Sequence, residues 1–368
     1  MSLPGIVKLS GTADGVKTLE ASGLSNIENG TAMAPDALFQ IASMTKAITS
    51  VAALRLVEAG KLSLHDPIRD VLPELAELRV LSGFGDDGKP MFAPASTPVT
   101  LAHLLTHTAG FGYEFMSAEL NTALGDDRGA PGTLASLNTP LLFEPGTQWE
   151  YGISTDWAGR AVEAATGQTL GAVVAELVTG PLGMVDTTFQ PTDAQRARGA
   201  SLYARDEAGA LMPMPLDFGG GRNAEFEPGG AGLWSSAEDY FRFLQLILNQ
   251  GVHKGERLLS EETMRLLTSN QIGSLRAGAM GSIMPMMAHP YDPFPGMDCG
   301  WSMAFLINKE VGPYGRSAGS LAWAGIANCH YFIDLARGRA AIMLMQLLPF
   351  GDPEALDAFR AFEQGVSA

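Results

Sequence analysis

The feature that most constrains this chain is an almost wholly apolar segment that starts directly after a serine and contains a lysine. Residues 44–57 place alanine, valine, isoleucine or leucine on nearly every helical face, and Gly60 is the stop signal. A helix that is apolar all round is buried in a protein core. Lys46 is therefore predicted to be buried, which is costly unless the ammonium has a task. Ser43 lies three residues earlier on the same helical face.

The pairing of Ser43 with Lys46 predicts nucleophilic chemistry. A serine hydroxyl is a weak nucleophile until a base removes its proton. Desolvation lowers the pKa of a lysine, so Lys46 is expected to act as that base. The alternative is that Ser43 caps the helix while Lys46 extends its ammonium to solvent. Two details favour chemistry: only this one of the seven lysines has a serine three residues before it, and it lies in the most apolar helix.

Composition limits the class of protein and its partners. The 368 residues are 46% hydrophobic and 17% charged, as expected for a soluble globular chain of one large or two moderate domains. A net charge of −16 without a basic run argues against nucleic acid and anionic membranes as partners. The start of the chain lacks a signal-peptide pattern, so we expect a cytoplasmic protein. Cys299 and Cys329 allow one disulfide or none, and reduced thiols are favoured.

Strand signals gather at the two ends of the chain. The N-terminal end predicts a hairpin of residues 5–10 and 18–23, and the C-terminal end predicts strands and one helix: 300–308, 319–334 with an interruption at Gly325, 338–347, and helix 352–365. Because each end alone has too few strands, we expect one antiparallel sheet built from both. The prediction is an α/β fold of the α+β type, with residues 1–67 and 226–368 as the sheet domain.

Residues 68–225 are predicted to form a mostly helical inserted domain, with the active site between the two domains. Strand signals are scarce in this segment, and its helical candidates include 100–107 and 156–178. The loops 81–98 and 113–140 are long enough to be binding walls. After the insertion, a capping pattern at Ser236 predicts a further helix to about residue 249, and the Met- and Pro-rich segment 274–297 predicts an adaptable apolar loop.

Three motifs in order resemble a known enzyme superfamily. Ser43-Met44-Thr45-Lys46 resembles the Ser-x-x-Lys of serine β-lactamases and penicillin-binding proteins. Tyr151-Gly152-Ile153 stands where the class C branch has Tyr-x-Asn, and Trp323-Ala324-Gly325 stands where it has Lys-Thr-Gly. The Trp-x-Gly version is similar to the family VIII carboxylesterases. The resemblance spans nearly the whole chain and implies a β-lactamase/transpeptidase-like fold.

The resemblance also implies roles for individual residues. Ser43 would be the acylated nucleophile, and Lys46 and Tyr151 would share the general-base task. The backbone N–H groups of Ser43 and Ile326 would form the oxyanion hole. The substrate would lie against a small group of residues: Trp323, Ala324, Gly325 and Ile153. No cofactor and no metal are implied.

Two departures from the family pattern shape the expected substrate. Trp323 replaces the lysine that holds the carboxylate of β-lactams and peptides, which favours neutral, apolar, short- to medium-chain esters. Ile153 replaces the asparagine, so one amide contact to substrate is lost. We therefore expect a serine carboxylesterase with an acyl-serine intermediate and weak β-lactamase side activity. Acyl transfer to an alcohol or amine, or an idle binding scaffold, are the alternatives, and the oligomeric state is not predicted.

Two further patterns favour other chemistry and are weaker. Ser317 lies in a Gly-x-Ser-x-Gly motif, but this motif needs a strand before it and a helix after it, and the acid-then-histidine order fails here. His103 and His107 have the spacing of a metal pair, but no further ligands accompany them. We interpret both as structural.

Overall fold

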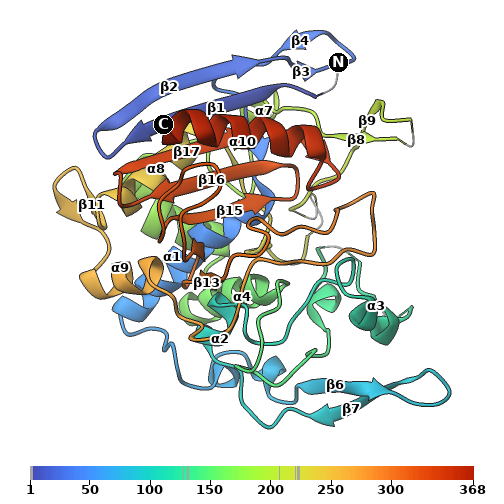
Figure 1. Ribbon diagram of the computed structural model, residues 1–368. Helices are drawn as coiled ribbons and strands as arrows, with labels where there is room; N and C mark the ends of the chain where they lie inside the picture. The colour runs from blue at the N-terminus through green and yellow to red at the C-terminus, as the bar shows by residue number, and fades with distance from the viewer. Residues whose placement is uncertain (1–2, 127, 131, 207, 220, 222–223) are drawn as a thin grey trace.

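The centre of the molecule is a seven-stranded sheet in which every neighbouring pair is antiparallel. It belongs to a computed structural model that describes residues 3–368 except 127, 131, 207, 220, 222 and 223 (Figure 1). The strands, in spatial order, are β13 (Cys299–Trp301), β14 (Leu306–Asn308), β15 (Leu321–Gly325), β16 (Cys329–Asp334), β17 (Arg339–Leu344), β1 (Ile6–Thr12) and β2 (Gly15–Ser22).

The two ends of the chain meet in this sheet, as predicted. β1 pairs with β17 from Val7 opposite Leu344 to Thr12 opposite Arg339. The predicted strand 300–308 was wrong in one respect, since it is a hairpin of β13 and β14. Ser302 makes the turn, because its side-chain oxygen accepts the N–H groups of the two residues at positions 304 and 305.

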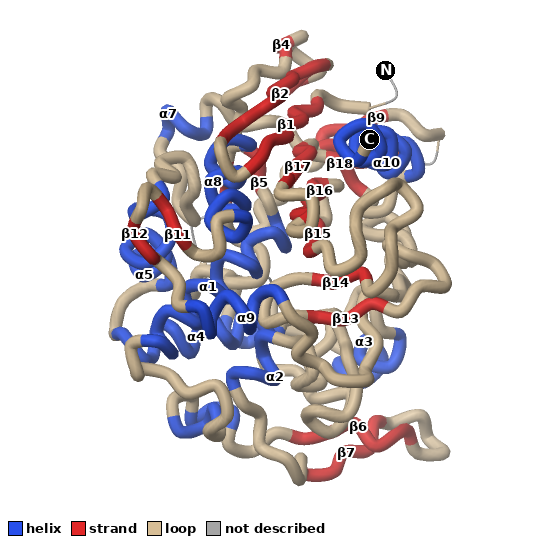
Figure 2. The backbone as a smooth tube through the Cα atoms, turned by 60° about the vertical axis from the view of Figure 1, so that its left-hand side comes forward, coloured by secondary structure: helices blue, strands red, loops and turns tan. Residues whose placement is uncertain are grey.

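Helices cover both faces of the sheet. Figure 2 shows α8 (Ala237–Leu248) on one face and α10 (Pro353–Ser367) on the other. Ser236 caps α8 by accepting the N–H of Asp239. Asp352 does the same for Ala355 of α10, and proline at the first helical position suits that start. The layers are therefore helix, sheet, helix.

Two helices of residues 68–225, α4 (Ser154–Thr166) and α5 (Leu170–Val174), pack against α1 (Thr45–Glu58). The predicted helix 156–178 is divided at Gly167, whose φ of 69° ends α4 (Ser154–Thr166) before α5 (Leu170–Val174) and a π-turn at Ala175–Thr179. The predicted loop 81–98 was wrong, since β6 (Arg79–Phe84) and β7 (Pro90–Pro94) form a projecting hairpin there (Figure 1).

The remaining elements are short. They are β3 (Leu24–Asn26), β4 (Thr31–Ala32), β5 (Phe39–Gln40), β8 (Tyr203–Arg205), β9 (Leu211–Pro213), β10 (Trp234–Ser235), β11 (Val252–His253), β12 (Glu256–Arg257), β18 (Leu347–Leu348), α2 (Leu101–Leu105), α3 (Ala118–Leu124), α6 (Gly180–Leu182), α7 (Asp193–Arg196), α9 (Glu261–Thr268) and 3₁₀ turns at Ala42–Met44, Ile68–Asp70, Pro73–Leu75 and Leu134–Leu137. Within the described part of the chain, no helix is both long and apolar enough to cross a membrane.

The division into two domains remains a proposal. Residues 68–225 contain most of the shorter helices, but they also contain the β6–β7 hairpin. The end of this segment pairs with residues of the sheet domain: β8 pairs with β18, and Gly199 forms a bridge with Leu38. We propose that the helical domain ends before this return.

Candidate active site

Ser43 lies in a 3₁₀ turn directly before α1 and is half-buried. The preceding Ala42 has a φ of 45°, a left-handed conformation that is uncommon for alanine. Met44, not Ser43, is the N-cap of α1, and no side-chain capping bond is present at either helical start. The alternative in which Ser43 is a helix cap is therefore wrong, and its hydroxyl is available for another task.

The end of β15 packs directly on this turn. A Cβ atom at Gly325 would lie 2.4 Å from the carbonyl oxygen of Ile41, much closer than real Cβ atoms come. Glycine at this position therefore allows the strand to reach the serine turn. Ile326 follows at once, so its backbone lies at the same end of the cavity as Ser43. This contact explains why the third motif ends in glycine.

Lys46 is buried, with 2% of its surface exposed, and does not reach solvent. Its Nζ donates to the carbonyl oxygen of Gly230 at 2.8 Å, to the hydroxyl of Tyr113 at 3.0 Å and to Oγ of Ser43 at 3.3 Å. An ammonium has three hydrogens to donate, and three oxygens receive them. None of these oxygens belongs to a carboxylate.

The pKa of Lys46 moves in the direction opposite to the prediction. Burial lowers it, as expected, but Tyr113, Tyr151 and Asp156 together outweigh burial and raise the pKa above its ordinary value. The direction of this shift favours an ammonium at Lys46, which donates to Ser43, over the predicted neutral amine. The predicted role of Lys46 as a base stays a prediction.

Asp156 and Gly230 hold the far side of the lysine. Oδ1 of Asp156 accepts the N–H of Gly230 at 2.9 Å, while the Gly230 carbonyl faces Lys46. A Cβ atom at Gly230 would lie 2.7 Å from a carboxylate oxygen of Asp156, so any larger residue would displace this side chain. Burial raises the pKa of Asp156, although Lys46 and the Gly230 N–H act against the rise. The segment after Pro228 is thereby fixed on α1.

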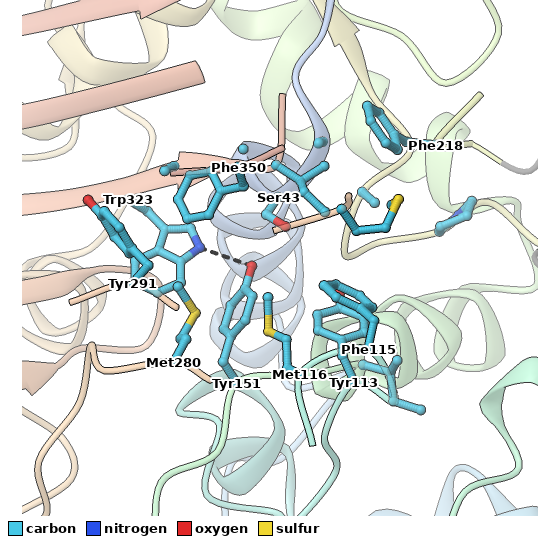
Figure 3. Close-up of a pocket in the computed structure, with 18 of the residues that line it drawn as sticks. Ser43, Tyr113, Phe115, Met116, Tyr151, Phe218, Met280, Tyr291, Trp323 and Phe350 are labelled. Atoms are coloured by element: carbon cyan, nitrogen blue, oxygen red, sulfur yellow. Dashed lines mark hydrogen bonds between the residues drawn. The ribbon is translucent and has the colours of Figure 1, made fainter. Parts of the chain in front are cut away.

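Tyr151 faces the same cavity from the start of α4. Its hydroxyl accepts a hydrogen bond from Nε1 of Trp323 at 3.0 Å, and Figure 3 shows it pointing toward Ser43. Nζ of Lys46 lies 4.7 Å from the centre of the Tyr151 ring, within cation–π range. Position 152 has room only for glycine, because a Cβ atom there would lie 2.3 Å from the carbonyl oxygen of Phe111. Trp323 is thus a hydrogen-bond donor to Tyr151 as well as a wall.

Other aromatic rings support Tyr151 from behind. The centre of the His107 ring lies 4.9 Å from that of Tyr151 and 5.2 Å from that of Trp301. Burial lowers the pKa of His107 well below its usual value, so the imidazole is neutral. His103 instead accepts the N–H of Thr100 at the start of α2. No cluster of three or more potential metal ligands occurs among the residues that the structure describes.

A cavity of about 350 Å³ joins these groups. Every predicted site residue except Lys46 lines it: Ser43, Tyr151, Ile153, Trp323, Ala324, Gly325 and Ile326. Much of the predicted wall 113–140 contributes, as do Met280 and Met287 of the methionine-rich loop, whereas no described residue of 81–98 lines the cavity. The exposed surface of the cavity is mainly apolar.

The other candidate groups lie apart from this chemistry. Oγ of Ser317 donates to Asp334 at 3.0 Å, and no helix follows the serine directly, because β15 comes next. Cys299 and Cys329 are both free and buried. The sequence analysis missed Tyr113 and Asp156. Tyr113 lay inside a predicted wall, but nothing in its spacing indicated a bond to Lys46.

The fold and the serine at the start of a buried helix define the class of the serine β-lactamases and penicillin-binding proteins. The chain belongs to the beta-lactamase family, whose model matches residues 2–365. It is a serine hydrolase of this fold, as predicted.

Three known proteins are similar over nearly the whole length. Lovastatin esterase of Penicillium rubens is 32% identical over 342 residues, which cover 90% of this chain and 85% of that protein. Monacolin J acid methylbutanoyltransferase of Aspergillus terreus is 30% identical over 347 residues, 89% of this chain and 81% of the relative. The structure of simvastatin synthase LovD from Aspergillus terreus has a TM-score of 0.87 and 28% identity, with 100% of this chain and 94% of that one covered. One relative is an esterase and one an acyltransferase, in agreement with the predicted esterase and its acyl-transfer alternative.

Proposed function

We propose that the protein is a serine carboxylesterase that forms an acyl intermediate on Ser43. The observation that carries the proposal is the set of contacts around this hydroxyl. Lys46 donates to it at 3.3 Å from a buried position, and the Tyr151 hydroxyl, bonded to Trp323, points toward it (Figure 3). A nucleophile, a fixed cation and a tyrosine at one cavity wall support acyl transfer.

In the proposed mechanism Tyr151 reacts as the phenolate, its own proton having been lost to solvent, and takes the proton of Ser43. The negative charge of this phenolate is favoured by the Trp323 N–H bond and by the nearby ammonium of Lys46. Ser43 Oγ attacks the ester carbonyl, and the backbone N–H groups of Ser43 and Ile326 receive the oxyanion. Tyr151 then returns the proton to the leaving alcohol. Lys46 keeps its charge throughout.

Neutral, apolar esters of short to medium chain length are the proposed substrates. The wall that would meet a substrate carboxylate carries Trp323, Ala324 and Ile153 in place of a cation. A carboxylate there would lose its hydration without gaining a partner. We therefore expect slow turnover of β-lactams such as nitrocefin, well below that of p-nitrophenyl butyrate.

Acyl transfer is the second candidate function, and the apolar cavity together with the similarity to a methylbutanoyltransferase favours it. An alcohol or amine that fills an apolar cavity can compete with water for the acyl group. The partition of p-nitrophenyl butyrate between butyrate and butyl ester, measured at increasing butanol concentration, separates the two functions. Free butyrate alone at every concentration would exclude transfer.

Ser43→Ala tests the proposal. We expect a loss of p-nitrophenyl butyrate hydrolysis on the order of 10⁶-fold in kcat, as for other serine nucleophiles. Ser317→Ala is the matched control and should keep its activity, because Ser317 lies outside the cavity lining. A fluorophosphonate should add its mass to the wild type and to Ser317→Ala but not to Ser43→Ala. Complete inertness of the wild type would instead favour an idle scaffold.

A further inference from the structure

The cavity extends from Ser43 past the end of β15 to the face of the sheet that α10 covers. Ala324 of β15 lies opposite His330 of β16 in the antiparallel pair, so their side chains share that face. The small side chain of Ala324 leaves room above the strand. We name this part the rear lobe and define it by Arg316, His330 and Phe359, all of which line the cavity.

The passage between Ser43 and the rear lobe is apolar. Ala324 and Phe350 belong to one buried cluster, against which Met280, Tyr291 and Ile326 pack. Figure 3 shows Met280, Tyr291 and Phe350 together on one side of Tyr151, with Tyr113 and Phe115 on the other. A hydrocarbon chain that leaves the Ser43 region on the Phe350 side would therefore meet only apolar surface before the rear lobe.

His330 is an unusual group at the end of such a passage. It has 2% of its surface exposed, and its ring stacks on Phe359 with 4.6 Å between the ring centres. Its Nε2 atom has no hydrogen-bond partner among the described residues. Buried polar atoms are almost always paired, because leaving one unpaired destabilises the fold. A ligand hydroxyl that reached Nε2 would supply the hydrogen bond that this nitrogen lacks.

The charges around the rear lobe select a neutral ligand group. Burial, followed by repulsion from Arg316 and Arg360, lowers the pKa of His330 to about 3, so the imidazole is uncharged at neutral pH. Arg316 is already bonded through two nitrogens to Glu363. Arg360 is bonded to the carboxylate of Asp357, so both arginines have carboxylate partners. A hydroxyl suits a neutral imidazole best, because it can both donate and accept.

The acyl part of the ester is the arm that would enter this lobe. In the mechanism proposed above, the leaving alcohol must lie within reach of the Tyr151 hydroxyl. We place the acyl chain toward Phe350, which lines the cavity and packs with Ala324. We propose that the rear lobe is an acyl subsite for medium-chain acyl groups whose far end carries a hydroxyl, bonded by His330. This inference rests on the proposed esterase function.

Sheet geometry sets the chain length that would reach His330. Gly325 contacts the serine turn, Ala324 precedes it, and His330 lies one strand further. A strand spacing of ~4.8 Å and a rise of ~3.3 Å per residue place His330 on the order of 10 Å from that turn. With bonds of ~1.5 Å, a zigzag chain of about eight atoms spans this distance. Hydroxyl-tipped hexanoyl, octanoyl and decanoyl esters cover chain lengths below, at and above the one that would reach His330.

The test compares p-nitrophenyl esters of these acids with their methyl-tipped counterparts, using acetate as the reference within each variant. At the best length, the wild type should prefer the hydroxyl-tipped ester by about 10-fold in kcat/KM, the value of one hydrogen bond. His330→Phe keeps an aromatic ring to stack on Phe359. In this variant the ratio of kcat/KM for the hydroxyl-tipped ester to that for the methyl-tipped ester should fall to 1 or below. His330→Gln, which keeps a donor and an acceptor, should retain part of it.

Two results would overturn the subsite. One is a wild type without preference at any chain length, and the other is a preference that persists in His330→Phe. The wild-type ratio decides the first even if a variant folds poorly. Failure of the subsite with intact acetate turnover leaves the esterase function standing, whereas acetate turnover in Ser43→Ala would remove the function itself.

Discussion

Two buried cations lie near the cavity, and their partners differ. Lys46 has 2% of its surface exposed and bonds only to uncharged oxygens, those of Ser43, Tyr113 and Gly230. Arg316 has 4% exposed and bonds through two nitrogens to the carboxylate of Glu363. Burial is almost equal, so the partner distinguishes the two sites.

A buried charge can serve chemistry or structure, and the charge of its hydrogen-bond partner decides which. The charge of a guanidinium bonded to a carboxylate is compensated by that carboxylate, and the pair joins two segments of the fold. An ammonium bonded to hydroxyls leaves its charge uncompensated at hydrogen-bond distance. Negative charge that forms on Ser43 or Tyr151 during a reaction then finds a cation already in place. We therefore expect changes at Lys46 to reduce activity and changes at Arg316 to reduce stability.

Lys46→Met should cause the largest effect. The substitution keeps chain length and removes the cation that stabilises developing negative charge, so kcat for p-nitrophenyl butyrate should fall by about 10²- to 10³-fold. Lys61→Met, at an exposed position just after α1, is the matched control and should be near wild type. Circular dichroism checks the fold of both variants. Retained turnover in Lys46→Met would show that the buried cation has no part in the reaction.

Arg316→Met should leave Glu363 buried without its partner. The expected loss in the free energy of unfolding is about 3–5 kcal/mol, measured by urea denaturation. Adding Glu363→Leu should recover much of this loss, because the unpaired carboxylate is then gone. A single variant as stable as wild type, or a double variant as unstable as the single one, would contradict the structural role of the pair.

Trp323→Phe should remove one hydrogen bond and keep an aromatic ring. Without the Nε1 donor, negative charge on the Tyr151 oxygen is less stabilised, and kcat should fall by about 10-fold with little change in KM. A rise in KM with unchanged kcat would instead assign Trp323 to substrate contact alone. Steady-state kinetics over a series of acyl chain lengths distinguishes the two results.

Glu150 is a half-buried acid, and its substitution should have the smallest effect of the four, a change in how stability depends on pH. Burial, with a contribution from Glu119, raises the pKa of Glu150 to about 7 from the ordinary 4.5. Between these values the folded state holds more protons than the unfolded chain, so stability should fall as pH rises through this window. Glu150→Gln should therefore flatten the dependence of Tm on pH and raise Tm at pH values above the window. An unchanged slope would contradict the shift.

The sheet and α1 could be predicted because their signals are local or strongly patterned. An apolar surface on all sides identified α1 as buried, and strand signals at both ends required a common sheet. The β6–β7 hairpin was missed, although residues 85–89 close a turn in which Gly85 donates to the carbonyl of Lys89. Two glycines around a pair of aspartates were a usable turn signal there.

The site could be predicted only as far as ordered motifs reach. Ser43, Tyr151 and Trp323 were found because each lies in a short motif of the family pattern. Tyr113 is bonded to Lys46 across 67 positions of sequence, and no spacing rule encodes such a contact. For the same reason the sign of the Lys46 pKa shift was missed. Burial follows from composition, whereas the opposing tyrosines and Asp156 appear only in the folded chain.

The charge of Lys46 is the most direct test of this account. Carbon-13 labelling of the lysine side chains, with Lys46→Met to assign the signal, follows each ammonium by NMR as the pH rises. The account predicts that Lys46 remains an ammonium throughout the neutral range and beyond it, because its pKa is raised above the ordinary lysine value. A Lys46 signal that loses its proton near neutral pH would show a neutral amine in the working pH range and would contradict the proposed division of roles between Lys46 and Tyr151.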